Sequence, residues 1–342
     1  MMNLNSFIFE NTMQTLKDYI MLEISKLTDE KILAEIKSII LSHNMDSKSI
    51  EDYFSKRHLD NCYKLILSKF NSHGDVEKLQ ELITNNGSDI DSTKFLNASN
   101  KNIYTVFQNV CNKDTISSLY ELNLPSKNNI ARGKLEVLLN TVLSDIDPAG
   151  HGDVPTVGSG VIEVKGSGGM IKGQVSYNIA ACAIKFNEIF SRKDKDIFEK
   201  QKTLNNLLNE LRESWSDEDI LKGIIECYLA KYPSEDEVIK NQFQQYVLDN
   251  QSKIFLKSKV DSKVLWDAFL VTDFKFYQLL DKWDNLIVFN ESGKYSAINA
   301  EKEIKMPYES VLNTLNVNGI KRITSSVKIN DGRYQAIKIK KL

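Results

Sequence analysis

The sequence predicts an α+β protein with a helical N-terminal region and a small C-terminal part rich in β-hairpins. Three observations predict this class. Apolar residues recur at three- and four-residue spacing over residues 5–122. Residues 150–173 hold eight of the chain's 15 glycines, which marks tight turns. Short β-branched runs bounded by turn residues follow near the C-terminus. We therefore expect three parts: residues 1–124, 125–284 and 285–342.

The bulk composition is that of a folded protein and leaves its partners open. The chain has 342 residues, 42% hydrophobic and 26% charged. A net charge of -2 neither supports nor excludes nucleic acid, because binding needs only a local basic groove. No apolar run suits a membrane span and no secretion signal is visible, so we expect a cytoplasmic protein. The cysteines form no CxxC pair, which predicts buried free thiols at Cys62, Cys111, Cys182 and Cys227.

The N-terminal region shows the apolar spacing of packed helices and no cluster of chemically reactive side chains. Ser49, with Asp52 three residues later, has the pattern of a helix start. We expect this region to dock other proteins, with a contact to DNA as the alternative.

The central part begins after Pro125 and alternates helix and strand. Residues 133–139 predict an amphipathic helix with Glu136 near its start. Residues 154–157 form a short extended run. Residues 161–165 are mostly β-branched or charged and predict a strand. The glycines at 158–160 can reverse the chain between these two runs.

Helices are predicted again from residue 179 to residue 248, and hairpins after residue 285. Apolar faces recur over residues 184–190 and 204–211, and Ser216 with Asp219 marks a helix start. Residues 234–248 predict one more helix. Residues 286–289 and 295–298 predict a hairpin, and residues 327–329 and 334–339 a closing one around Asp331-Gly332.

The strand at 161–165 presents two charged side chains together. Period two turns Glu163 and Lys165 to the face opposite Ile162 and Val164. A hairpin would bring Asp153 toward Glu163. Because neighbouring ionised carboxylates repel each other, we expect a hard divalent cation between them, Mg²⁺ with Mn²⁺ as a substitute. The cation would activate water and polarise a phosphoryl group, while Lys165 would position that water or help to deprotonate it.

These pieces together resemble the PD-(D/E)XK, or restriction-endonuclease-like, nuclease superfamily. They are Glu136, Gly152-Asp153-Val154 and Glu163-Val164-Lys165-Gly166, within about residues 130–190. The run after Glu163 is similar to that of phage-encoded members. The resemblance implies an αβββαβ core, with a mixed sheet flanked by helices, and Mg²⁺-dependent cleavage of DNA. It implies metal ligands at Asp153 and Glu163, a third acid at Glu136 and a catalytic lysine at Lys165. The family often has Pro-Asp where this chain has Gly-Asp.

Two assignments stay open at this stage. Asp147, sixteen residues before Glu163, is an alternative to Asp153, which lies ten residues before it and is preferred. The glycine-rich segment after Lys165 could hold a DNA phosphate through backbone N–H groups, or only connect to the next helix. Its candidate substrate-binding residues are Gly166, Ser167, Gly168, Gly169, Lys172 and Gln174.

The leading hypothesis is a Mg²⁺-dependent deoxyribonuclease, acting in a host cytoplasm or a virion if the chain is phage-encoded. The alternative is a virion or assembly protein that keeps a nuclease-like fold for binding. DNA is the expected partner. Phage or assembly proteins and a second copy of the chain are further candidates.

Overall fold

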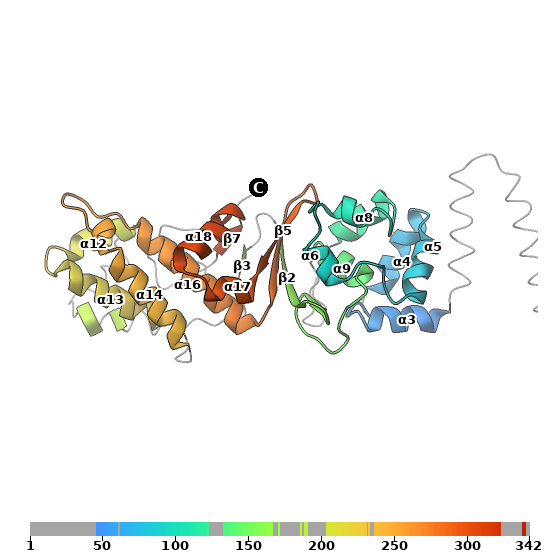
Figure 1. Cartoon of the computed structure of the whole chain (residues 1–342), viewed down its shortest axis with the longest axis horizontal. Helices are drawn as coiled ribbons and strands as arrows, with labels where there is room; N and C mark the ends of the chain where they lie inside the picture. The colour runs from blue at the N-terminus through green and yellow to red at the C-terminus, as the bar shows by residue number, and fades with distance from the viewer. Residues whose placement is uncertain are drawn as a thin grey trace, which may run out of the picture. The chain divides into compact units, whose positions relative to one another are not determined.

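The computed structural model describes residues 46–60, 62–122, 133–166, 170–171, 185–186, 188–190, 203–230, 232, 236–322 and 337–339. They form two compact units, which divide the chain between Gly158 and Ser159. Helices predominate, and strands form a mixed sheet, so the predicted α+β class is confirmed (Figure 1). No helix in these ranges is long and apolar enough to cross a membrane.

The first unit is built from short helices. They are α3 (Ser47–Ser55), α4 (Tyr63–Ser72), α5 (Val76–Thr84), α6 (Ser92–Leu96), α7 (Ile103–Val106), α8 (Lys113–Glu121) and α9 (Glu136–Val142), followed by strand β1 (Val154–Thr156). The predicted helical character is confirmed over residues 46–122, whereas residues 5–45 lie outside the described ranges. The predicted helix start at Ser49 is wrong. Asp46 caps α3 instead, because its carboxylate accepts the N–H groups of Lys48 and Ser49.

Helix α9 is buried on every side. The sequence predicted an amphipathic helix here, with one exposed face. That prediction is wrong, because all residues from Glu136 to Val142 are buried. Its polar side chains are accommodated by local bonds. Thr141, for example, donates through Oγ1 to the carbonyl of Val137 at 2.7 Å. A short helix without an exposed face depends on its neighbours for position.

A buried arginine holds the C-terminal end of α9. Arg57 donates through Nη1 to the carbonyls of Asn140 and Leu143, at 3.0 and 2.6 Å. Its guanidinium carbon lies 4.3 Å from the ring centroid of Tyr53. Burial lowers the pKa of Arg57. Carbonyl groups at a helix C-terminus favour a cation, so this side chain ties α9 to the segment that follows α3.

The second unit contains a mixed sheet. Strand β2 (Gly160–Gly166) pairs in parallel with β4 (Asn285–Phe289), and β4 pairs antiparallel with β5 (Tyr295–Asn299). The predicted hairpin of β4 and β5 is confirmed. Its turn is closed by Asn290, whose side chain accepts the N–H groups of Ser292 and Lys294 at 3.1 Å.

Helices pack around one apolar core in this unit. They are α12 (Leu204–Leu211), α13 (Asp217–Leu229), α14 (Glu237–Asp249), α15 (Gln251–Ile254), α16 (Lys263–Asp281), α17 (Ala300–Lys305) and α18 (Tyr308–Val317). The long helix α16 lies beside α14 and α18 (Figure 1). The apolar face at 204–211 is buried as predicted, and so are Phe186 and Phe190. Ile184 lies outside the described residues.

A second sheet has the order β3-β7-β6 and is antiparallel. Its strands are β3 (Met170–Ile171), β7 (Ile337–Ile339) and β6 (Ile320–Arg322). The closing hairpin was predicted to pair residues 334–339 with 327–329. Residues 337–339 form a strand, as predicted, and it pairs with β6 and β3. Residues 327–329 lie outside the described ranges, so their pairing stays a prediction. The predicted turn at Asp331-Gly332 lies outside the described residues.

The described cysteines are buried thiols. Cys62, Cys111 and Cys227 are free and buried, as predicted, and Cys182 lies outside the described ranges. Burial raises the pKa of the Cys111 thiol, which keeps it protonated and unreactive.

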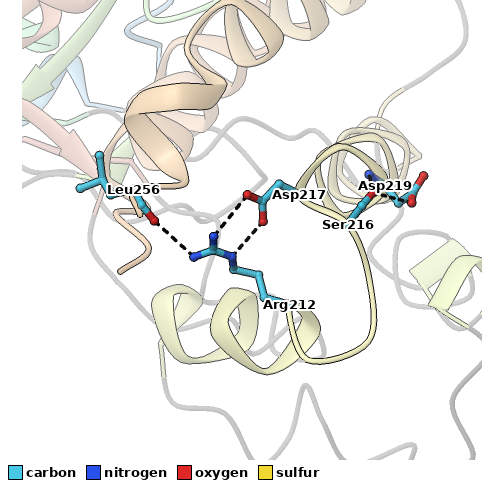
Figure 2. Close-up of polar contacts among 5 residues, drawn as sticks. All are labelled: Arg212, Ser216, Asp217, Asp219 and Leu256. Carbon is cyan, nitrogen blue, oxygen red and sulfur yellow. Dashed lines mark hydrogen bonds and ion pairs between the residues drawn. The ribbon is translucent and has the colours of Figure 1, made fainter. Parts of the chain in front are cut away.

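Arg212 joins α12 to two later segments (Figure 2). Its Nε lies 2.8 Å from Asp217 Oδ1, and Nη2 donates to Asp217 Oδ2 at 3.3 Å. Its Nη1 donates to the carbonyl of Leu256 at 3.4 Å. Figure 2 also shows Ser216, whose hydroxyl accepts the N–H of Asp219 at 3.2 Å, which confirms the predicted helix start.

We expect Arg212→Lys to lower the free energy of unfolding by about 1 kcal/mol, because an ammonium cannot engage both Asp217 oxygens and a third acceptor in one plane. Urea denaturation measures the change. The control is Lys222→Gln, which breaks the exposed pair of Lys222 with Glu218 on α13 and should have no measurable effect. Equal losses in the two variants would contradict the importance of the forked geometry.

Candidate active site

Strand β2 presents an ion pair that is largely withdrawn from water. Lys165 Nζ lies 2.5 Å from Glu163 Oε1, and the two side chains are 21% and 12% exposed. Ile162 and Val164 alternate with them and are buried. The predicted shared face of Glu163 and Lys165 is therefore confirmed. Desolvation makes such a pair costly, so a strand that retains one is a candidate functional site.

Helix α16 adds a contact to this pair that the sequence analysis missed. The hydroxyl of Tyr277 donates a hydrogen bond to Glu163 Oε1. Tyr277 is 2% exposed, and its ring centroid lies 5.5 Å from that of Trp283. The bond joins residues 114 positions apart in the chain, and a single aromatic residue inside an apolar helix carries no local signal for such a role.

In the first unit, Asn140 joins the segments that bear the other two predicted acids. Its Nδ2 donates to the carbonyl oxygens of Glu136 and Asp153, each at 2.9 Å. Asn140 is buried, the bond to Glu136 is buried as well, and the bond to Asp153 is partly buried. The backbone of Asp153 is thereby held beside α9, whose first residue is Glu136.

The Glu136 side chain turns back over the loop that precedes α9. A Cβ placed on Gly133 would lie 2.6 Å from Glu136 Oε1, so a side chain at that position would displace the carboxylate. Leu135, between them, has φ of 69°, a left-handed conformation that is uncommon for a branched residue. Backbone strain of this kind gathers at functional sites, and here it directs the start of α9.

Asp147, the alternative acid, is engaged in its own turn. Its Oδ1 accepts the N–H of Ala149 at 2.9 Å, and its backbone N–H donates to Pro155 at 3.0 Å. This is a local turn-forming role of the kind that Asp side chains often have. The contact gives the Asp147 side chain a local structural role, and the preference for Asp153 over Asp147 stays a prediction.

The predicted acids divide between the two units. Glu136 and Asp153 belong to the first, and Glu163 and Lys165 to the second, so the proximity of Asp153 to Glu163 stays a prediction. Among the residues described, no group of three or more His, Cys, Asp or Glu side chains is arranged to hold a metal ion. The predicted donors are all carboxylates, which fit Mg²⁺ or Mn²⁺ better than a soft metal.

The glycine-rich segment is described only at its start. A Cβ on Gly166 would lie 2.9 Å from Cζ of Phe289, its partner on β4, so packing alone accounts for this glycine. The other predicted substrate-binding residues lie outside the described ranges, and their role stays a prediction: Ser167, Gly168, Gly169, Lys172 and Gln174.

We expect Asn140→Ala to lower the free energy of unfolding by about 1–3 kcal/mol, because the change removes the shared donor of two carbonyls in a buried position. Chemical denaturation measures it. Asn97→Ala is the matched control, since Asn97 Nδ2 also donates four residues back, to Thr93, but on an exposed surface. That control should lose less than about 0.5 kcal/mol. A loss at Asn140 no larger than at Asn97 would show that the bond to Asp153 contributes nothing.

In comparisons with known proteins, no family model, curated protein or solved structure matches this chain. The assignment of the site therefore depends on its residues and their contacts.

Proposed function

We propose that this protein is a metal-dependent deoxyribonuclease of the PD-(D/E)XK type, with a restriction-endonuclease-like core, that hydrolyses phosphodiester bonds. Asp153, Glu163 and Lys165 would form its site, with Glu136 as a third acid. The observation that carries the proposal is the ion pair of Glu163 and Lys165, 2.5 Å long and largely desolvated on β2. A pair of surface charges on a solvated hairpin would not need this burial.

Two further observations support the proposal. The sheet around Glu163 is mixed, as the superfamily resemblance implies, with parallel β2 and β4 and antiparallel β5. The helix that begins at Glu136 is buried and tied through Asn140 to Asp153, as expected for an acid-bearing helix beside the Asp of the motif.

The donor chemistry suits a hard cation. Asp153, Glu163 and Glu136 would hold Mg²⁺, with water and phosphate oxygens as the remaining ligands. When bound, the ion polarises the phosphoryl group and lowers the pKa of a coordinated water.

Lys165 has its own part in the proposed reaction. Its ammonium is held at the site by the pair with Glu163, where it can orient the attacking water through its N–H donors. The same positive charge would stabilise the negative charge that builds up on the phosphoryl oxygens in the transition state. The segment with Lys172 and Gln174 would hold the neighbouring DNA phosphate.

Incubation of supercoiled and linear DNA with the full chain, in Mg²⁺, in Mn²⁺ and in EDTA, tests the proposal. We expect nicking or degradation that requires the metal. Asp153→Ala and Lys165→Ala should each lower the cleavage rate on the order of 100-fold or more, because each removes a group that acts on the transition state.

Asp147→Ala is the matched control, because it removes a nearby carboxylate that serves its own turn. It should cleave at close to the wild-type rate. The absence of metal-dependent cleavage in every condition would refute the nuclease hypothesis and favour the alternative of a binding or assembly protein. Loss of cleavage in Asp147→Ala with activity retained in Asp153→Ala would show that Asp147, and not Asp153, is the acid of the site.

A further inference from the structure

We infer that Tyr277 is a positioning residue, whose hydroxyl sets the orientation in which the Glu163 carboxylate meets the divalent cation. The inference rests on the proposed function. Its starting observation is that the Tyr277 hydroxyl and the Lys165 ammonium both contact Oε1 of Glu163.

A carboxylate needs such a contact in order to act as a defined ligand. The last side-chain torsion of a glutamate has a broad distribution, so the rotamer of the side chain does not fix the plane of the two carboxylate oxygens. Lys165 is itself long and flexible and cannot fix that plane alone. Carboxylates that bind metals are in turn hydrogen-bonded by outer groups, and loss of such a group weakens metal binding.

Tyr277 is rigid enough for this role. Its ring is buried against Trp283, which has no exposed surface. One helical turn earlier, buried Asp273 accepts hydrogen bonds from the hydroxyls of Tyr228, at 2.7 Å, and Tyr232. These bonds tie α16 to α13 and fix the segment of helix that carries Tyr277.

The strand on the other side of the bond is also fixed. Helix α16 leads into β4, and β4 pairs in parallel with β2, so that Glu163 lies opposite Leu286. The backbone of Asp284 extends this pairing, because its N–H donates to the carbonyl of Val161 at 2.9 Å. The acceptor Glu163 therefore lies on a strand whose backbone is bonded to the segment that directly follows the donor's helix, α16.

Tyr308 provides a comparison within the same core. It is buried, and its hydroxyl bonds Thr272 Oγ1 on α16 at 2.7 Å. That bond joins α18 to α16 and involves no predicted metal ligand. Tyr→Phe at 308 and at 277 thus removes one buried hydroxyl each, and only the second of them touches Glu163.

The test measures Mn²⁺ binding to the full-length protein without DNA, by electron paramagnetic resonance of the free ion. We expect Tyr277→Phe to raise the Kd for Mn²⁺ about tenfold or more, and Tyr308→Phe to leave it unchanged. Phenylalanine at position 277 keeps the packing of the ring on Trp283. Thermal melts followed by circular dichroism select a temperature at which both variants are folded.

DNA cleavage at increasing Mn²⁺ concentration gives the second readout. If Tyr277 acts through Glu163, the rate of Tyr277→Phe recovers toward that of the wild type as the ion saturates the site. A wild-type protein that neither binds Mn²⁺ nor cleaves DNA would refute the proposed function, and this inference with it. A wild type that binds and cleaves, beside a Tyr277→Phe variant that behaves like Tyr308→Phe, would overturn the inference alone.

Discussion

The withdrawal of Glu163 from water is the constraint on which the second unit depends. A carboxylate that is 12% exposed loses most of its hydration, and its surroundings must replace what water supplied. In place of water, Lys165 supplies a positive charge to the carboxylate and Tyr277 supplies a hydroxyl donor. The first comes from the same strand and the second from α16, so β2 and α16 must be placed together. The parallel pairing of β2 with β4, which follows α16, provides that placement.

The first unit meets a similar constraint at α9. A helix buried on all sides has no exposed polar face to define its orientation, so bonds to buried polar groups position it. Arg57 holds its C-terminal carbonyls, and Asn140 joins its first turn to the backbone of Asp153. The Arg57 contacts join residues 83 and 86 positions apart, so the position of Glu136 is a tertiary property and does not follow from helix propensity.

The parts of the fold that the sequence predicted are those set by local geometry. The alternation along β2 placed Glu163 and Lys165 on one face, and Ser216 marked a helix cap through a bond to its near neighbour Asp219. Apart from the helix start predicted at Ser49, which Asp46 caps instead, the failures were nonlocal. Full burial of α9, the partners of β7 and the role of Tyr277 depend on segments distant in the chain, and no periodicity encodes them. The two-unit division also leaves the approach of Asp153 to Glu163 a hypothesis.

The parallel arrangement of β2 and β4 has a consequence for the order of assembly. Antiparallel neighbours can pair as soon as a short turn closes, but these two strands are separated by the whole of α12 to α16. On a ribosome, the strand that bears Glu163 emerges well before Tyr277, 114 positions later. Pairing over such a separation is slow, because loop closure precedes any gain from contacts. The charged pair on β2 thus stays hydrated in the nascent chain and reaches its desolvated state only late in folding.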